Sequence, residues 1–127
     1  MAIYADYKTI PGLVATGDLS SYQYYIVCAA STAGAVKVAV TAATDPILGV
    51  LQNDPTDGQA AEVAFKGVCK VLSEAATTYG SQVTCSSTGR ALTTDVDGDR
   101  IVGIALEAGG AGEMIHIALS RHDRFKA

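Results

Sequence analysis

Ile47-Leu48-Gly49-Val50 opens one segment of this 127-residue chain, and Ile101-Val102-Gly103-Ile104 opens a second segment that repeats it. The two segments align without a gap, each residue 54 positions from its counterpart, as residue 101 is from residue 47. A repeat of this kind indicates one supersecondary unit used twice around a shared core. The shared residues are small or aliphatic and carry no reactive group, so the repeat favours a structural or binding protein. The identical pairs are Ile47/Ile101, Gly49/Gly103, Gly58/Gly112 and Ala64/Ala118.

The segments around the repeat are typical of short strands joined by turns. Residues 36–40 alternate as Val-Lys-Val-Ala-Val, a strand pattern, and only residues 73–79 are expected to form a helical turn. The upstream hairpins also resemble one another, because Val27-Cys-Ala-Ala-Ser-Thr matches Val83-Thr-Cys-Ser-Ser-Thr. This spacing predicts an all-β fold, a small barrel or sandwich-like domain built from two related hairpin units. Strands are expected at residues 21–29, 36–40, 47–52, 61–65, 67–72, 82–85, 90–94, 101–106 and 113–119.

The N-terminal region differs from the rest, since five of the six tyrosines lie in the first 25 residues. Tyrosine is favoured at interfaces because it combines an apolar ring with a polar tip. The region therefore either packs on its own domain or contacts a partner, and the sequence leaves both alternatives open. The predicted organisation is an extended arm at 1–18, a single β domain at 19–120 with its repeat at about 22–72 and 79–120, and a charged tail at 121–127.

Composition excludes several classes of protein. The net charge is −4 and the nine basic residues are scattered, apart from three in the tail, so nucleic-acid binding is not expected. No stretch approaches the roughly 20 apolar residues that span a bilayer, and no signal peptide is expected. Cys28, Cys69 and Cys85 show no metal-ligand spacing and are expected to be small buried side chains.

The sequence contains no complete catalytic or metal-binding motif. The serine-hydrolase motif GxSxG does not occur, and the two histidines, His116 and His122, lie near the C-terminus. His116 alternates with isoleucines, so it is expected on the solvent-facing or interface side of a strand. Asp95-Val96-Asp97-Gly98-Asp99 resembles a calcium loop, but its glycine and closing residue fall at the wrong positions, so a hairpin turn is the better interpretation. The sequence predicts no enzyme, no cofactor and no metal site.

The segment Asp45-Pro46-Ile47-Leu48-Gly49-Val50-Leu51-Gln52-Asn53 resembles the capsid decoration, or cement, proteins of tailed bacteriophages. The later stretches 66–71, 80–84 and 101–108 are similar to successive hairpins of that family, so the resemblance covers roughly Gly17 to Leu119. The family's defining residues are structural, and no catalytic residue is carried over.

The resemblance implies a structural virion protein. It would bind the outer surface of an icosahedral phage capsid and stabilise the shell at junctions between major capsid subunits, self-associating as a homotrimer after synthesis in the host cytoplasm. Our hypothesis for the contact with the major capsid protein, or with a neighbouring copy, is Ile3, Tyr4, Tyr7 and Ile10. The alternative is a virion-surface adhesion or carbohydrate-binding module on the same scaffold. The expected loops disfavour it, because they lack aromatic side chains apart from Tyr79.

Overall fold

The computed structural model describes residues 5–39, 46–93 and 101–119, and within these ranges the chain forms ten β-strands and no helix. The predicted all-β fold is therefore confirmed. The strands are β1 (Asp6–Thr9), β2 (Val14–Ala15), β3 (Ile26–Ala29), β4 (Ala35–Val38), β5 (Ile47–Leu51), β6 (Val63–Leu72), β7 (Gln82–Cys85), β8 (Ala91–Thr93), β9 (Gly103–Ala105) and β10 (Met114–Leu119).

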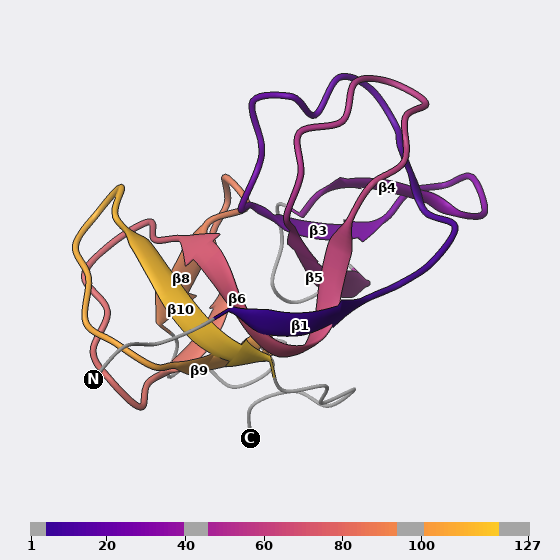
Figure 1. Ribbon diagram of the computed structural model, residues 1–127. Coiled ribbons are helices and arrows are strands. Elements are labelled where there is room, and N and C mark those ends of the chain that lie inside the picture. The colour runs from indigo at the N-terminus through magenta and orange to yellow at the C-terminus, as the bar shows by residue number, and fades with distance from the viewer. Residues whose placement is uncertain (1–4, 40–45, 94–100, 120–127) are drawn as a thin grey trace.

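All ten strands belong to one sheet, in the order β2-β4-β3-β5-β6-β10-β9-β7-β8, with β1 also paired to β6. The long strand β6 links two lobes, because its first residues pair with β5 and its last residues pair with β10 (Figure 1). Isolated bridges join Val14 to Ala60 and Ser73 to Ala91, which bring β2 and β8 back beside the two ends of β6. Each lobe therefore curls into a barrel-like half, and β6 is common to both.

The pairing register is the same in the two segments that repeat in sequence. The hairpin of β5 and β6 has the same cross-strand partners as the hairpin of β9 and β10, shifted by the 54 positions of the sequence alignment. The strands that precede these hairpins also pair alike, β3 with β5 and β7 with β9. The equivalent pairs are Val50–Ala64 and Ile104–Ala118, Leu51–Val63 and Ala105–Ile117, and Val27–Gly49 and Val83–Gly103.

Two pairs of repeated glycines have clear physical reasons. A Cβ at Gly49 would overlap the carbonyl oxygen of Ala64, and a Cβ at Gly103 would overlap that of Ala118, so the neighbouring strand approaches too closely for a side chain. Gly58 and Gly112 lie in open space, but their φ angles of +81° and +78° fall in the left-handed region that favours glycine. The repeat thus conserves backbone geometry.

The core contains two packed clusters of apolar side chains. Ile26, Val27 and Cys28 on β3 have no exposed surface, because one face of this strand packs on each cluster. The three cysteines are buried, as expected, and form no disulfide among the described residues. Burial raises the pKa of the Cys69 thiol to about 12, so the group stays protonated.

Three expectations need correction. The first strand of the domain begins at Ile26 and not near residue 21, because residues 21–25 form a turn. Residues 73–79 form bridges and bends and no helical turn. Strands expected separately at 61–65 and 67–72 are one strand, β6, which continues through Gly67. Gly67 permits this course because its φ is +103° and a Cβ there would overlap the backbone of Asp6.

Candidate functional site

Of the four residues expected to contact a partner, the structure describes Tyr7 and Ile10. Ile3 and Tyr4 lie outside the described residues. Tyr7 and Ile10 are half-buried, Tyr7 against the main core cluster and Ile10 against the second one. The described part of the N-terminal segment therefore packs on its own domain, with β1 antiparallel to β6.

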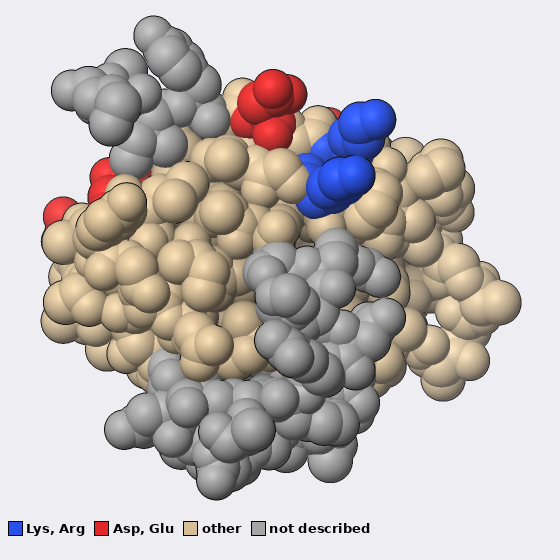
Figure 2. Space-filling model, turned by 90° about the horizontal axis from the view of Figure 1, so that it is seen from below, with Lys and Arg blue, Asp and Glu red and all other residues tan. Residues whose placement is uncertain are grey.

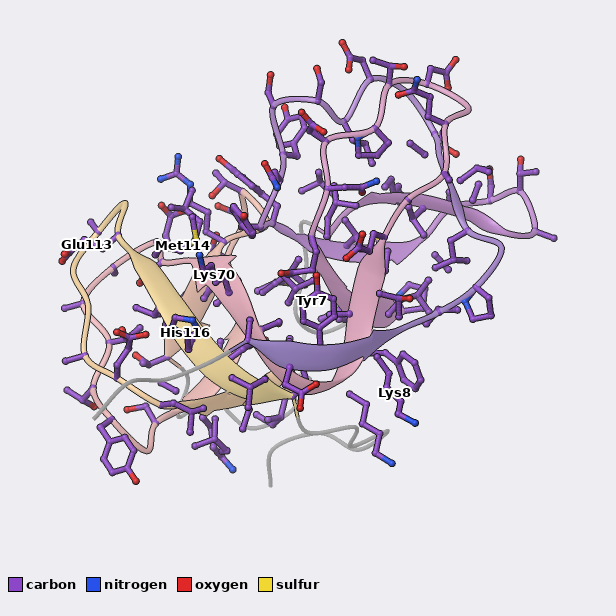
Figure 3. The ribbon with its side chains drawn as sticks, viewed as in Figure 1. Tyr7, Lys8, Lys70, Glu113, Met114 and His116 are labelled. Carbon is purple, nitrogen blue, oxygen red and sulfur yellow. The ribbon has the colours of Figure 1, made fainter. Side chains whose placement is uncertain are left out.

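Tyr7 is fixed in place by a side-chain hydrogen bond. Its hydroxyl donates to Oε1 of Glu62 at 2.6 Å, which joins β1 to the residue just before β6. This hydrogen bond, helped by burial, raises the pKa of Tyr7 from 10.0 to about 12. Figure 3 shows Tyr7 and Lys8 on opposite sides of β1, as strand alternation requires. Of the two neighbours, Lys8 is the exposed one.

Lys8 lies directly opposite Lys66 in the β1–β6 register, and both side chains are exposed. Like charges in this arrangement destabilise a sheet slightly. Neither lysine forms an ion pair with any described residue. On the face shown in Figure 2, basic side chains gather at one place, with acidic side chains close by, among described residues that are mostly uncharged. The Lys8–Lys66 pair is therefore available to an acidic partner.

A second basic pair, Lys70 and His116, lies across β6 and β10, and Figure 3 labels both residues. His116 is half-buried, and its Nδ1 lies 2.6 Å from Oε2 of Glu107. The hydrogen bond from His116 holds the pKa of Glu107 below its usual value. The ring of His116 is thus already engaged within its own lobe.

An open pocket of about 540 Å³ lies beside the turn that precedes β3. Tyr22 and Tyr25 form two of its walls, with ring centroids 5.0 Å apart and ring planes at 89°. The guanidinium carbon of Arg90 lies 5.7 Å from the centroid of the Tyr25 ring, within cation–π range. We call this feature the tyrosine pocket, and it is lined by Leu19, Tyr22, Tyr25, Val38, Thr88 and Arg90.

Glu74 fixes the polar side of the tyrosine pocket. It accepts hydrogen bonds from Thr88 Oγ1 at 2.5 Å and from Ser86 Oγ at 3.0 Å, and its Oε2 lies 3.5 Å from Arg90 Nη1. The bonds from Thr88 and Ser86 hold the pKa of Glu74 below its usual value. Arg90 also donates from Nε to the Tyr25 hydroxyl at 3.2 Å. The arginine and the tyrosine are therefore held in position before any ligand arrives.

The tyrosine pocket was missed from sequence because residues 22–25 were assigned to a strand. The repeat contains the signal that could have found it. The turn Tyr22–Tyr25 has the same backbone hydrogen bond as the turn Thr78–Ser81, which holds a glycine at position 80. Aligning these two segments would indicate a turn at residues 22–25, and Tyr22 on this turn is exposed.

The described residues contain no cluster of three or more side chains suited to a metal ion, and Asp95–Asp99 lies outside the described ranges. His122 and the charged tail also lie outside them. Among the described residues no helix is long and apolar enough to span a membrane.

Comparisons with known proteins identify relatives of the β domain. A family profile described as "Phage cement protein" matches residues 20–120. A crystal structure of the head fiber gp8.5 N base in bacteriophage phi29 has a TM-score of 0.68 and 18% sequence identity, and the match covers 86% of this chain and 91% of that one. At this identity the likeness concerns the fold. No curated protein matches the sequence.

Proposed function

This chain belongs to the phage cement protein family, and from that membership we propose that it binds the outer surface of an icosahedral capsid and stabilises the shell at junctions between major capsid subunits. The family and the fold shared with a head fiber base mark it as a phage virion structural protein. The observation that carries the proposal is the extent of the match, because residues 20–120 include strands β3 to β10 and both repeat units. We also propose that it has no enzymatic activity.

The physics of a small protein on a large shell supports this function. A 13.0 kDa protein covers little area on one capsid subunit, so a single contact is weak. Many copies on a symmetric lattice, or a homotrimer that spans several subunits, gain avidity through effective concentration. A junction is the place where one copy can contact two subunits and resist their separation.

The N-terminal segment remains our proposed contact, with the structure refining which atoms are accessible. Ile3, Tyr4, Tyr7 and Ile10 were the expected contact residues. Tyr7 and Ile10 are half-buried on their own domain, so their role would be to hold β1 against β6. The exposed Lys8 and its neighbour Lys66 would then meet carboxylates on the shell, and the β1–β6 pair would be relieved of its like-charge repulsion.

Co-sedimentation with expanded capsids that lack decoration protein tests the proposal. We expect saturable binding at a fixed ratio to the major capsid subunit. The double variant Lys8→Glu/Lys66→Glu should bind at least about tenfold more weakly. The new carboxylates would repel the acidic side chains of the shell, which slows association and lowers affinity. Lys37→Glu, an exposed lysine on β4, is the matched control and should bind like the wild type.

Two results would count against the proposal. If the folded wild-type protein fails to sediment with capsids, the proposed capsid binding is wrong. If Lys37→Glu weakens binding as much as the double variant does, binding depends on net charge, and the assignment of Lys8 and Lys66 is wrong.

A further inference from the structure

The turn beside the tyrosine pocket carries side chains that the scaffold does not require. In the second repeat unit the corresponding turn is Thr78-Tyr79-Gly80-Ser81, and Gly80 has a φ of +86°. In the first unit Tyr24 occupies that position with a φ of +71°, and it is the one non-glycine residue with positive φ among the described residues. A bulky residue in this region costs free energy, and such outliers gather at functional sites.

The tyrosine pocket has the size and composition of a ligand site. Its volume of about 540 Å³ lies within the range of roughly 300–1,000 Å³ typical of small-ligand pockets. Tyr22 is 38% exposed although it is a large aromatic residue. Its ring stands at right angles to Tyr25, so the pocket offers an aromatic wall that solvent reaches.

The pocket wall formed by the loop at residues 86–90 is closely packed against its neighbours. A Cβ at Gly89 would overlap Cγ1 of Val38 and would lie 3.3 Å from Cδ2 of Tyr25. The loop that carries Thr88 and Arg90 is therefore packed against β4 and Tyr25 without room for another side chain. Its Ser86 N–H donates to the Arg90 carbonyl at 2.7 Å, which closes the loop at its base.

The polar groups favour a ligand that is neutral and rich in hydroxyls. Arg90 and Glu74 carry opposite charges 3.5 Å apart, so they cancel and the pocket has no net attraction for an ion. A guanidinium can still donate further hydrogen bonds, and hydroxyl side chains can both donate and accept. A sugar ring matches this arrangement, because it has apolar C–H faces that pack on an aromatic ring and hydroxyls around its edge.

We propose that the tyrosine pocket binds a neutral glycan, with one pyranose ring packed on Tyr22 and its hydroxyls bonded to Arg90 and Thr88. The site is a glycan-binding function beyond capsid stabilisation. It also removes the sequence-based objection to an adhesion role, because the tyrosines lie on a turn and not within a strand.

A glycan array that carries both neutral and acidic oligosaccharides is the first test, using the full chain. The strongest neutral hit is then titrated by isothermal calorimetry against wild type, Tyr22→Ala, Arg90→Met and the control Tyr79→Ala. Tyr79 is 76% exposed and lies on the corresponding turn of the second unit, outside the pocket. Wild type and Tyr79→Ala should bind equally, and the two pocket variants should bind at least tenfold more weakly. Circular dichroism checks that each variant is folded.

The outcomes separate this proposal from the capsid function. No hit on the array, hits confined to acidic glycans, or equal loss in Tyr79→Ala would overturn the glycan site. Loss of capsid co-sedimentation by Tyr22→Ala, with no glycan bound by wild type, would show that the pocket holds a protein side chain instead. Glycan binding by wild type that Tyr22→Ala abolishes supports the site, whether or not the protein also sediments with capsids.

Discussion

The two repeat units share a backbone but differ in what they place on it. The Tyr24 N–H donates to the Leu51 carbonyl at 2.7 Å, and the Gly80 N–H donates to the Ala105 carbonyl at 2.8 Å. Leu51 and Ala105 are counterparts in the repeat, so the two turns occupy the same place in their lobes. The first turn carries the tyrosines of a pocket, whereas the second carries a glycine and one exposed tyrosine. The backbone of the two turns is therefore the same, and only their side chains differ.

The same contrast holds one hairpin later, where Glu62 and His116 are counterparts. Glu62 accepts a hydrogen bond from Tyr7 of the N-terminal segment at 2.6 Å. His116 lies at the same distance from Glu107 of its own lobe. In both lobes the backbone N–H at this position donates to a side chain of the same lobe, Glu62 to Asn53 at 2.9 Å and His116 to Glu107 at 2.8 Å. The N-terminal segment adds a further side-chain hydrogen bond to the first lobe, from Tyr7.

If the units are equivalent in backbone, the largest effect should come from their glycines. Gly49→Ala and Gly103→Ala should each destabilise the protein by at least about 3 kcal/mol, because the new Cβ would overlap a carbonyl oxygen of the paired strand. Urea denaturation followed by circular dichroism measures the loss. Similar values for the two variants would support equivalence of the lobes.

The turn glycines provide the matched control. Gly58→Ala and Gly112→Ala introduce no contact within 4 Å, so they should cost only the roughly 1–2 kcal/mol of a left-handed backbone. If Gly49→Ala and Gly58→Ala prove equally costly, close strand approach is not the reason for the first glycine. If Gly49→Ala costs much more than Gly58→Ala, but Gly103→Ala costs no more than Gly112→Ala, the two lobes are not equivalent.

The sequence predicted the repeat, its register and the all-β class because these depend on local pattern. The spacing of glycine and aliphatic residues indicates which strands pair. Gly49 and Gly103 are examples, because each lies where the paired strand leaves no room for a side chain. The course of β6 could not be predicted. Whether two apolar runs form one strand or two depends on Gly67 and on β1, which packs against it from a distant part of the chain.

The candidate sites were predicted only in part. The sequence singled out Tyr7 by composition, but its partner Glu62 is 55 residues away, and no local pattern reports that contact. The tyrosine pocket joins residues near position 22 with residues near position 90, and its turn was concealed by the apolar character of the tyrosines. A site assembled from several turns can be predicted only once the fold that brings those turns together is known.

The second comparison concerns the two turns and should give a smaller effect. At position 24, the glycine variant should be more stable than the alanine variant by about 1 kcal/mol, because both remove the ring and only glycine relieves the positive φ. At position 80, Gly80→Ala should cost about the same amount. Urea denaturation of the three variants measures both differences. Equal differences would support the equivalence of the two turns. If Tyr24→Ala is more stable than Tyr24→Gly, the positive φ at position 24 does not favour glycine and the equivalence is wrong.

An effect of about the same size should come from the hydrogen bond between Tyr7 of the N-terminal segment and Glu62 of the first lobe. Tyr7→Phe keeps the ring and removes the hydroxyl, so it should cost about 1 kcal/mol at neutral pH. Urea denaturation of the variant and the wild type over a range of pH measures the difference. The control is Tyr79→Phe, since Tyr79 is 76% exposed and should show no difference at any pH.

The pH dependence distinguishes this hydrogen bond from simple loss of packing. Because the pKa of Tyr7 is raised from 10.0 in the unfolded chain to about 12 in the fold, the folded state favours the protonated hydroxyl. Its contribution is complete below pH 10 and is lost as the pH rises toward 12. The advantage of wild type over Tyr7→Phe should therefore be constant up to pH 10 and shrink above it. If the two proteins are equally stable at every pH, Tyr7 holds β1 by its ring alone. An advantage of wild type that persists unchanged above pH 10 would mean that the hydrogen bond to Glu62 does not raise the pKa of Tyr7.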